Sequence, residues 1–422
     1  MTSKKRTSNP IFLGLTHVGQ VFSIGWSKKI GNCAVYDFDQ KKIKDFKNFE
    51  VTNEEPNLKK ILIKNASKIK ICESEKEIKR YKNVFLTIDT PLKDNGDPEV
   101  KLIKNIITKS VPYIGKNSNL IITSQVYCGF CEDLKKTILK KRKDINLIYM
   151  AETLIMGNAL SRFTKPERLI FGIENKNKFF YNLLKKFECE IFVLSLKEAE
   201  MVKIAVNLFL LTSVTYSNAM DYYCRQFGFK FSKINEAIRS DKRIGKYSYL
   251  SPSLGVSGGH LERDLYTIKK TSKSKHVKYL FSGIKKLNNS RIDLLFNEFK
   301  KLDKKFKFKK IIWMGPSYKE NSFSIINSPF LKFKNKIKKN RKKLFTYDSF
   351  FDLSKYKKMN SILNIHEALK GKNILVILNY LSDKDLKIFN QKTKNFNIKV
   401  LEVKIKSFFD SQTKKNITKI LN

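Results

Sequence analysis

The sequence predicts an α/β protein with two Rossmann-like, doubly wound domains joined by a long central helix and a helical connector. Short apolar strands alternate with helical segments up to about residue 196, which is typical of a mostly parallel sheet. A stretch without proline or internal glycine follows at residues 198–228, and a second series of strands starts near residue 309. Because 422 residues exceed one ordinary core, we expect three domains, at residues 1–196, 197–305 and 306–422.

The first predicted strand, residues 9–13, leads into the turn GLTHVG, and the second strand ends at Asp37. Strand, glycine turn, helix, strand and acid is the order of a dinucleotide-binding unit. Gly14 allows the tight turn, Gly19 lets the helix approach the strand, and the helix N-terminus faces the pyrophosphate. Asp37 can accept hydrogen bonds from both ribose hydroxyls and disfavours a 2′-phosphate, which favours NAD over NADP. Thr16 stands where the fingerprint has its second glycine. The predicted cofactor-binding residues of this unit are Gly14, Thr16, Val18, Gly19 and Asp37.

The remaining strands follow as short apolar runs. In the first domain they are KNVFLTIDTP, SNLIITSQV, INLIYMAE, RLIFGI and EIFVLSL. In the third domain they are KKIIWMGPSYKE, KLFTYDSF and KNILVILNYL. Apart from this two-lobed layout, the sequence has no evident internal repeat.

The stretch at residues 198–228 predicts one helix of about 45 Å that is apolar on nearly every face and is therefore buried. A membrane span is disfavoured, because Lys203, Asn207 and Asn218 interrupt the apolar run and such groups are costly in hydrocarbon. We expect a core helix that packs between two domains and against a second subunit. Lys203 and Asn207 share one face of this helix and form a candidate active-site pair. The alternative for Lys203 is a surface lysine with its ammonium group in water.

The formal net charge of +46 suggests a nucleic-acid partner. However, the lysines are spread along the whole chain, and Asn, Ile, Phe and Tyr, which also have A/T-rich codons, are abundant. The densest basic runs, near residues 300–310 and 332–343, lack a recognisable nucleic-acid module. A biased genome explains the charge, so we expect neither a nucleic-acid nor a membrane partner.

The cysteines are scattered and form no disulfide framework, and no signal peptide opens the sequence. We therefore expect a cytoplasmic protein. Cys128 and Cys131 have CxxC spacing, but no second pair or nearby histidine completes a metal site, so no metal is expected.

Further short motifs follow one another along the chain. They are EPNL at 55–58, TP at 90–91, SQV at 124–126, AETLIMG at 151–157, EMVKIAVNLFLL at 200–211 and RIG at 243–245. Together with GLTHVG, this order resembles the UDP-glucose/GDP-mannose dehydrogenase family over nearly the whole chain. The corresponding family motifs are EPxL, TP, a serine-led loop, PExxxEG, ELxKxxxNxFxA, RIG and GxGxVG.

The resemblance implies an NAD-dependent dehydrogenase that oxidises the C6 hydroxymethyl of a UDP- or GDP-sugar. Lys203 would stabilise negative charge at the C6 oxygen, and Glu152 would act as a base. Asn207 and Asp264 would hold a water that takes part in proton transfer. The family's central helix commonly buries its apolar face in a dimer, so a homodimer is expected. The resemblance also implies that Thr90 and Ser124 bind the cofactor and that Arg243, Gly255, Gly258 and Lys319 bind the substrate.

One segment departs from the family in a way that affects the chemistry. Residues 255–264 read GVSGGHLERD, where the family's GxGGxCxxKD carries a nucleophilic cysteine. His260 occupies the cysteine position, and a shift of one residue puts Leu261 there instead. Imidazole would give an unstable adduct, so we interpret His260 as a catalytic proton shuttle or hydrogen-bond donor. Met156 replaces the second glutamate of PExxxEG, and residues 315–326 resemble GLAFKxxTDDxR without its two aspartates and its arginine.

Three hypotheses remain from the sequence. The first is a nucleotide-sugar C6 dehydrogenase that stops at the aldehyde or oxidises its hydrate without a thioester. The second is a two-electron hydroxyacid-type dehydrogenase, which normally lacks a second α/β domain. The third is an NAD-binding protein of this family without catalytic activity.

Overall fold

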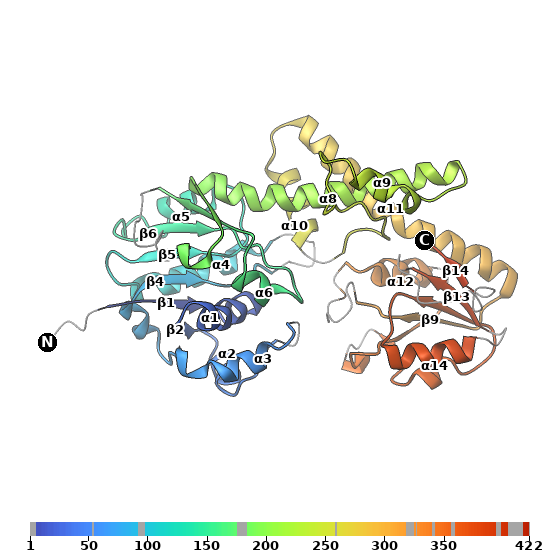
Figure 1. Cartoon of the computed structure of the whole chain (residues 1–422), viewed down its shortest axis with the longest axis horizontal. Coiled ribbons are helices and arrows are strands. Elements are labelled where there is room, and N and C mark those ends of the chain that lie inside the picture. Colours follow the sequence, from blue (N-terminus) through green and yellow to red (C-terminus); the bar gives the residue numbers. More distant parts are fainter. Residues whose placement is uncertain are drawn as a thin grey trace. The chain divides into compact units, whose positions relative to one another are not determined.

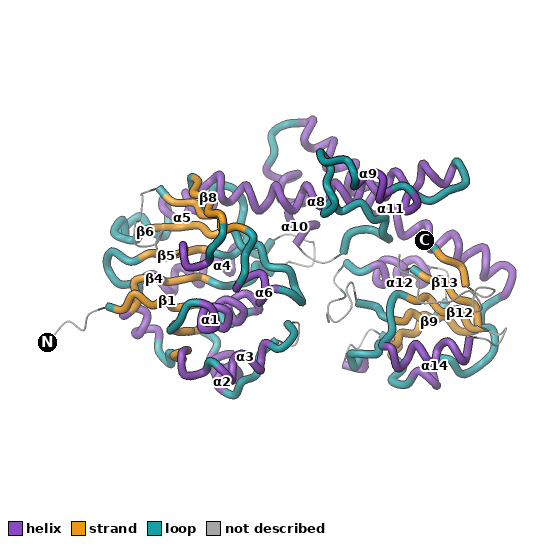
Figure 2. The backbone as a smooth tube through the Cα atoms, in the orientation of Figure 1, coloured by secondary structure: helices purple, strands orange, loops and turns teal. Residues whose placement is uncertain are grey.

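The computed structural model of this chain describes residues 6–52, 55–91, 98–174, 184–257, 260–317, 325, 327–339, 342–355, 359–393, 398–403 and 417–421. It divides into two compact units, Met1–Val206 (unit 1) and Asn207–Asn422 (unit 2). Each unit contains its own sheet, and Figure 2 shows the strands of each sheet side by side. The predicted fold class, two mostly parallel α/β sheets with a long helix between them in the sequence, is confirmed. The predicted three-domain boundaries stay a prediction.

Unit 1 is built on an eight-stranded sheet in the order β3-β2-β1-β4-β5-β6-β7-β8. Its strands are β1 Thr7–Leu13, β2 Cys33–Tyr36, β3 Ile69–Ile71, β4 Tyr81–Leu86, β5 Asn119–Ile122, β6 Asn146–Met150, β7 Arg168–Ile173 and β8 Glu190–Leu194. The pairs from β3 to β6 are parallel, whereas β6 and β7 pair in antiparallel fashion. The strand order reverses direction between β1 and β4, so a crevice is expected at the carboxyl ends of these two strands.

The helices of unit 1 connect these strands (Figure 1). They are α1 His17–Lys29, α2 Gln40–Lys47, α3 Leu58–Lys64, α4 Val100–Ser110, α5 Phe130–Lys136 and α6 Ala159–Thr164, followed by the first turns of α8 Leu196–Gln226. Helix α1 packs against α3 and α6, and its tryptophan, Trp26, lies in the core beside Phe12 and Phe85. The central strands read as continuous apolar runs because a parallel sheet is covered on both faces.

Unit 2 contains a six-stranded parallel sheet in the order β11-β10-β9-β12-β13-β14, which repeats the topology of unit 1. Its strands are β9 Lys310–Met314, β10 Leu344–Tyr347, β11 Asn360–Ser361, β12 Ile374–Leu378, β13 Ile398–Glu402 and β14 Ile417–Lys419. Its helices are the rest of α8, then α9 Asn235–Arg239, α10 His260–Thr271, α11 Lys275–Phe306, α12 Pro329–Lys339, α13 Ile365–Ala368 and α14 Asp383–Thr393.

Alternate residues of β9 and β12 face two separate cores, one on each side of the sheet. Ile311 and Trp313 pack with residues of α11 and α12, whereas Ile312 and Met314 pack with Phe389 of α14. Accordingly, α12 and α14 lie on opposite sides of this sheet (Figure 1). Unit 2 therefore has a complete doubly wound core of its own.

Helix α8 begins and ends two residues earlier than predicted, and it is less buried than predicted. Within this chain Phe209 is 69% exposed and Tyr223 is 55% exposed, so the expectation of a helix buried on every side is wrong for the single chain. By length and composition, α8 is the one helix among the described residues that could cross a membrane, and 39% of its most apolar 18-residue stretch is buried. The polar groups within the helix have protein partners: Lys203 with Glu152, Asn207 with Asp264 and Asn218 with Ser253.

Candidate active site

The turn after β1 is shaped by two glycines that no other residue could replace without displacement. Gly14 has a φ of +106°, and its N–H donates to the Tyr36 carbonyl at 2.9 Å. A Cβ on Gly19 would lie 1.7 Å from the Gly14 carbonyl oxygen, so α1 reaches the turn only because Gly19 has no side chain. The turn, the N-terminus of α1 and the end of β4 meet at the point where the strand order reverses. This is the place where α/β sheets bind dinucleotides.

Asp37 lies directly after β2, and both of its carboxylate oxygens are held by backbone groups. Oδ2 accepts the Leu15 N–H at 2.7 Å, and Oδ1 accepts the Asp39 N–H at 2.9 Å. The Lys42 ammonium group lies 3.7 Å from Oδ2. The carboxylate is thus fixed beside the glycine turn, where a ribose would lie.

The loops after β4 and β5 are tied together by the predicted cofactor residues. The Thr90 hydroxyl donates to the Gln125 carbonyl at 2.7 Å, and the Ser124 hydroxyl donates to the Ile88 carbonyl at 2.7 Å. Thr16, at the position of the second fingerprint glycine, donates its hydroxyl to the Thr87 carbonyl at 3.1 Å. These contacts join the loops after β1, β4 and β5, which are neighbours in the sheet, around the first turn of α1. This arrangement fits a dinucleotide.

Glu55 is a buried carboxylate that the sequence analysis quoted only as part of a motif. It pairs with the His17 side chain at 3.0 Å and accepts the N–H groups of Gly157 and Ala159 at 2.7 and 2.9 Å. Burial raises the pKa of Glu55, but the hydrogen bonds from His17 and the two backbone groups outweigh burial and hold the pKa below its usual value. Glu55 therefore connects the start of α1 to the loop after β6.

Glu152 and Lys203 are brought together in unit 1. Their charged atoms are 3.5 Å apart, and both side chains are largely buried. Glu152 also accepts the backbone N–H of Leu154, which holds its carboxylate at the carboxyl end of β6. The structure thus makes Lys203 a partly buried, paired lysine, and the alternative of a surface lysine is wrong.

One turn before Lys203, Glu200 is fully buried and holds the CxxC loop. Its carboxylate accepts the N–H groups of Gly129 and Cys131, the latter at 2.8 Å. Burial raises the pKa of both thiols in this loop, those of Cys128 and Cys131, which leaves them protonated at neutral pH. These contacts agree with a structural role for the CxxC segment.

Asn207 and Asp264 are brought together in unit 2. The Asn207 amide nitrogen donates to the Asp264 carboxylate at 2.6 Å, and both residues are buried. The Arg263 guanidinium lies 3.7 Å from the other carboxylate oxygen. Since Lys203 and Asn207 are four residues apart, each of the two predicted pairs has one member on α8, and these two members lie on consecutive turns of the helix.

The segment that precedes α10 is held at its backbone by buried polar side chains. Asn218 accepts the Ser253 N–H at 2.7 Å, Arg291 donates to the Ser253 carbonyl at 2.8 Å, and Asn288 accepts the Val256 N–H at 2.6 Å. Gly255 has a φ of +104°, and a Cβ there would lie 2.8 Å from the Asn288 carbonyl oxygen. The sequence marks Asn218 only as a polar residue within an apolar helix, and nothing in the spacing of Asn288 and Arg291 distinguishes them from ordinary helix positions.

Of the remaining predicted site residues, Arg243 has a partner of its own on the surface. The Arg243 side chain is 89% exposed and pairs with Asp241 at 2.6 Å. His260 begins α10, but its side chain lies outside the described residues, as do Gly258 and Lys319. The catalytic and binding roles assigned from the sequence stay predictions.

Comparison with known proteins places this geometry in a family. A model of the NAD binding domain of the UDP-glucose/GDP-mannose dehydrogenase family matches residues 9–187, and a model of its central domain matches residues 197–290. The chain is 26% identical over 354 residues to a UDP-glucose 6-dehydrogenase of Rickettsia bellii, which covers 82% of this chain and 80% of that protein. It is 30% identical over 264 residues to a UDP-glucose 6-dehydrogenase of Campylobacter jejuni, which covers 60% of this chain and 65% of that protein.

Solved structures show the same fold at lower identity. A UDP-glucose dehydrogenase from Pyrobaculum islandicum superposes with a TM-score of 0.83 at 18% identity, over 100% of this chain and 99% of that one. A UDP-D-ManNAc dehydrogenase from Pyrococcus horikoshii gives a TM-score of 0.83 at 19% identity, over 97% of this chain and 99% of that one.

Proposed function

Because the chain belongs to the UDP-glucose/GDP-mannose dehydrogenase family, with the family's NAD binding domain in unit 1, we propose that it oxidises the C6 hydroxyl of a UDP- or GDP-sugar. The observation that carries this proposal is the pairing of Glu152 with Lys203 and of Asn207 with Asp264 on consecutive turns of α8. An ammonium group, an amide and two carboxylates are the groups that a proton transfer next to a developing oxyanion requires.

NAD would be held at the glycine turn with Asp37 at its ribose, and it would supply the acceptor for the hydride that leaves C6. Lys203 stabilises the negative charge that develops on the C6 oxygen as its proton leaves. Asp264, fixed by the Asn207 amide, accepts that proton through a water, so the sugar loses one hydride and one proton and becomes the aldehyde. Glu152 orients Lys203 through the 3.5 Å ion pair and serves as a base toward water in any later hydration step.

We further propose that oxidation proceeds without a cysteine thioester. His260 stands where the family motif has its cysteine, and none of the six cysteines of the chain lies between residues 225 and 422. Oxidation beyond the aldehyde would then pass through the hydrate, which loses a second hydride, to a second NAD, and a proton to give the carboxylic acid, and this acid ionises to the carboxylate.

The test is NADH formation at 340 nm with a panel of UDP- and GDP-sugars, with the product identified by mass. One NADH with an aldehyde product makes this a two-electron enzyme, and two NADH with a carboxylate product indicates the hydrate route.

Lys203→Ala should lower kcat about 100- to 1000-fold, as the loss of one oxyanion donor does in other enzymes. Lys197→Ala is the matched control, because Lys197 lies on the same helix and pairs with Glu132 at 2.7 Å on the surface. If the protein binds NAD but oxidises none of the sugars, the remaining hypothesis is a family member without catalytic activity.

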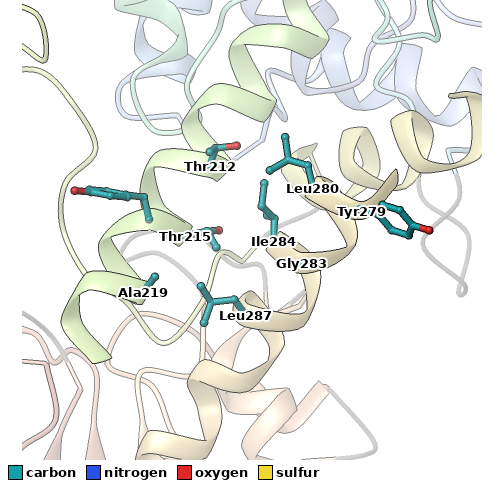
Figure 3. Close-up of a pocket in the computed structure, with 9 residues that line it drawn as sticks. Thr212, Thr215, Ala219, Tyr279, Leu280, Gly283, Ile284 and Leu287 are labelled. Atoms are coloured by element: carbon teal, nitrogen blue, oxygen red, sulfur yellow. The ribbon is translucent and has the colours of Figure 1, made fainter. Parts of the chain in front are cut away.

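We also propose that the protein is a cytoplasmic homodimer in which α8 and α11 meet their copies. Thr215, Tyr216 and Ala219 of α8 and Leu280 and Ile284 of α11 line an apolar groove of about 480 Å³ (Figure 3). Tyr279 of α11 also lines this groove and is exposed. Phe209 and Tyr223 of α8 are exposed as well, and each lies seven residues from Tyr216 and so on the same face of the helix. A contiguous apolar face of this kind on two long helices suits a self-complementary contact.

Sedimentation velocity tests the dimer. Ala219→Arg should convert the dimer to a monomer, because the guanidinium group enters the groove, whereas Lys301→Ala on the far part of α11 should not. A wild-type protein that sediments as a monomer would refute the proposed contact.

A further inference from the structure

The first turn of α1 receives a carboxylate from outside the glycine fingerprint. Asp89 lies three residues after β4, and its Oδ2 accepts the backbone N–H of Val18 at 3.3 Å. Its own N–H donates to the Thr16 hydroxyl at 3.1 Å, and that hydroxyl donates to the Thr87 carbonyl. Asp89 is therefore fixed at the N-terminus of a helix that has no acidic residue in its first turn.

The N–H groups of this turn are the donors that a dinucleotide-binding fold offers to the pyrophosphate. A carboxylate here occupies one of these donors and is attracted by the positive end of the helix dipole. It also adds a negative charge where the cofactor brings two phosphate groups. In addition, Thr16, which stands at the position of the second fingerprint glycine, contacts Asp89 directly. Thr16 and Asp89 thus form one connected unit at the pyrophosphate cradle.

We propose that Asp89 sets the affinity for the dinucleotide by competing with the pyrophosphate for the N-terminus of α1. Binding of NAD requires this carboxylate to release the Val18 N–H and to tolerate the phosphate charge beside it. The inference concerns only unit 1 and the NAD binding domain, so it does not depend on the proposed oxidation of a nucleotide sugar.

The test is a calorimetric titration of the full-length protein at low ionic strength with NAD, ADP-ribose and adenosine. Asp89→Asn keeps the shape and one oxygen acceptor for Val18 but removes the charge. It should lower the Kd for NAD and for ADP-ribose about three- to tenfold, since a single charge near a helix end has an effect of this size. The difference from wild type should shrink as salt is raised, because salt screens the repulsion. Adenosine lacks the pyrophosphate, so its Kd should not change.

Two further variants separate the charge from other effects. Asp89→Glu retains the carboxylate and should keep the wild-type Kd within about twofold, whereas Asp89→Ser should change the Kd in the same direction as Asp89→Asn. Glu188→Gln makes the same change in net charge at the far end of α1, where Glu188 pairs with Lys29 at 3.1 Å, and should leave the Kd unchanged. An unchanged or higher Kd for NAD in both Asp89→Asn and Asp89→Ser would overturn the inference. So would an equal change for adenosine and ADP-ribose.

Discussion

The ion pair between Arg291 and Asp221 should contribute more to the stability of unit 2 than any surface pair. Both side chains are fully buried, and the guanidinium nitrogen lies 2.9 Å from the carboxylate. Arg291 also donates to two backbone carbonyls and lies 4.6 Å from the centre of the Tyr222 ring. Among the described residues, the second Asp221 oxygen has no hydrogen-bond partner, so this carboxylate depends on its cations. Arg291→Met should therefore destabilise unit 2 by about 3–5 kcal/mol, the usual cost of removing one partner of a buried pair.

The chain contains its own reporters for this measurement. Trp26 lies in α1 of unit 1, Trp313 lies in β9 of unit 2, and the sequence has no other tryptophan. Urea unfolding followed by fluorescence in a Trp26→Phe background reports on unit 2, and in a Trp313→Phe background it reports on unit 1. With a slope of about 2–3 kcal/mol/M, the expected loss shifts the Trp313 midpoint by about 1–2.5 M urea. The Trp26 midpoint should stay in place.

Two control variants test whether the destabilisation by Arg291→Met comes from the burial of its ion pair. Lys301→Met removes an exposed pair with Glu298 on the same helix and should cost less than about 1 kcal/mol. The double variant Arg291→Met with Asp221→Leu should be more stable than Arg291→Met alone, because Arg291→Met leaves the buried Asp221 carboxylate with Arg225 but without its buried partner, whereas the double variant buries no carboxylate. A loss below about 1 kcal/mol in Arg291→Met, or an equal shift of the Trp26 midpoint, would refute the reasoning.

Three further outcomes follow from single contacts. Gly19→Ala should abolish NAD binding in a calorimetric titration, since the added Cβ would lie 1.7 Å from the Gly14 oxygen. The control Gly283→Ala adds a Cβ in open space and should bind NAD normally. Normal binding by Gly19→Ala would contradict the close contact. Hydrogen bonds hold the pKa of Glu55 below its usual value, so unit 1 should lose stability as the pH falls through that pKa. Glu55→Gln should reduce this loss of stability, as measured by the Trp26 fluorescence. The same dependence of stability on acid pH in wild type and Glu55→Gln would contradict this prediction. Burial raises the pKa of Asp348, so the charged form of this carboxylate is unfavourable in the folded protein. Asp348→Asn should therefore raise the urea midpoint of the Trp313 signal at pH 7. A lower midpoint would show that the ionised carboxylate is stabilising.

The fold was predictable from the sequence because apolar runs and glycine turns are local signals. The runs that became β1, β4, β5 and β6 were all located within a few residues. The antiparallel direction of β7 was not predictable, since alternation of apolar residues does not depend on strand direction. The strands β3, β11, β13 and β14 were missed. β3, β11 and β14 have only two or three residues each, and in β13 Lys399 and Glu402 interrupt the apolar run.

The candidate site was predictable only where residue type and order along the chain carry the information. Glu152, Lys203, Asn207 and Asp264 stand in recognisable motifs, and the structure pairs Glu152 with Lys203 and Asn207 with Asp264. Their catalytic roles stay predictions. Asp89 could not be found in this way, because its carboxylate reaches Val18 from 71 residues away and the fingerprint describes only the turn itself.

The open face of α8 has a consequence for how the protein must be handled. In the proposed homodimer a second copy covers the apolar side of α8, which couples folding to association, so the free energy of unfolding of unit 2 should rise with protein concentration. Unit 1, whose core closes on itself, should unfold at the same denaturant strength in dilute and concentrated samples. Enzyme assays at nanomolar dilution would then lose activity through dissociation, even where the catalytic groups are intact.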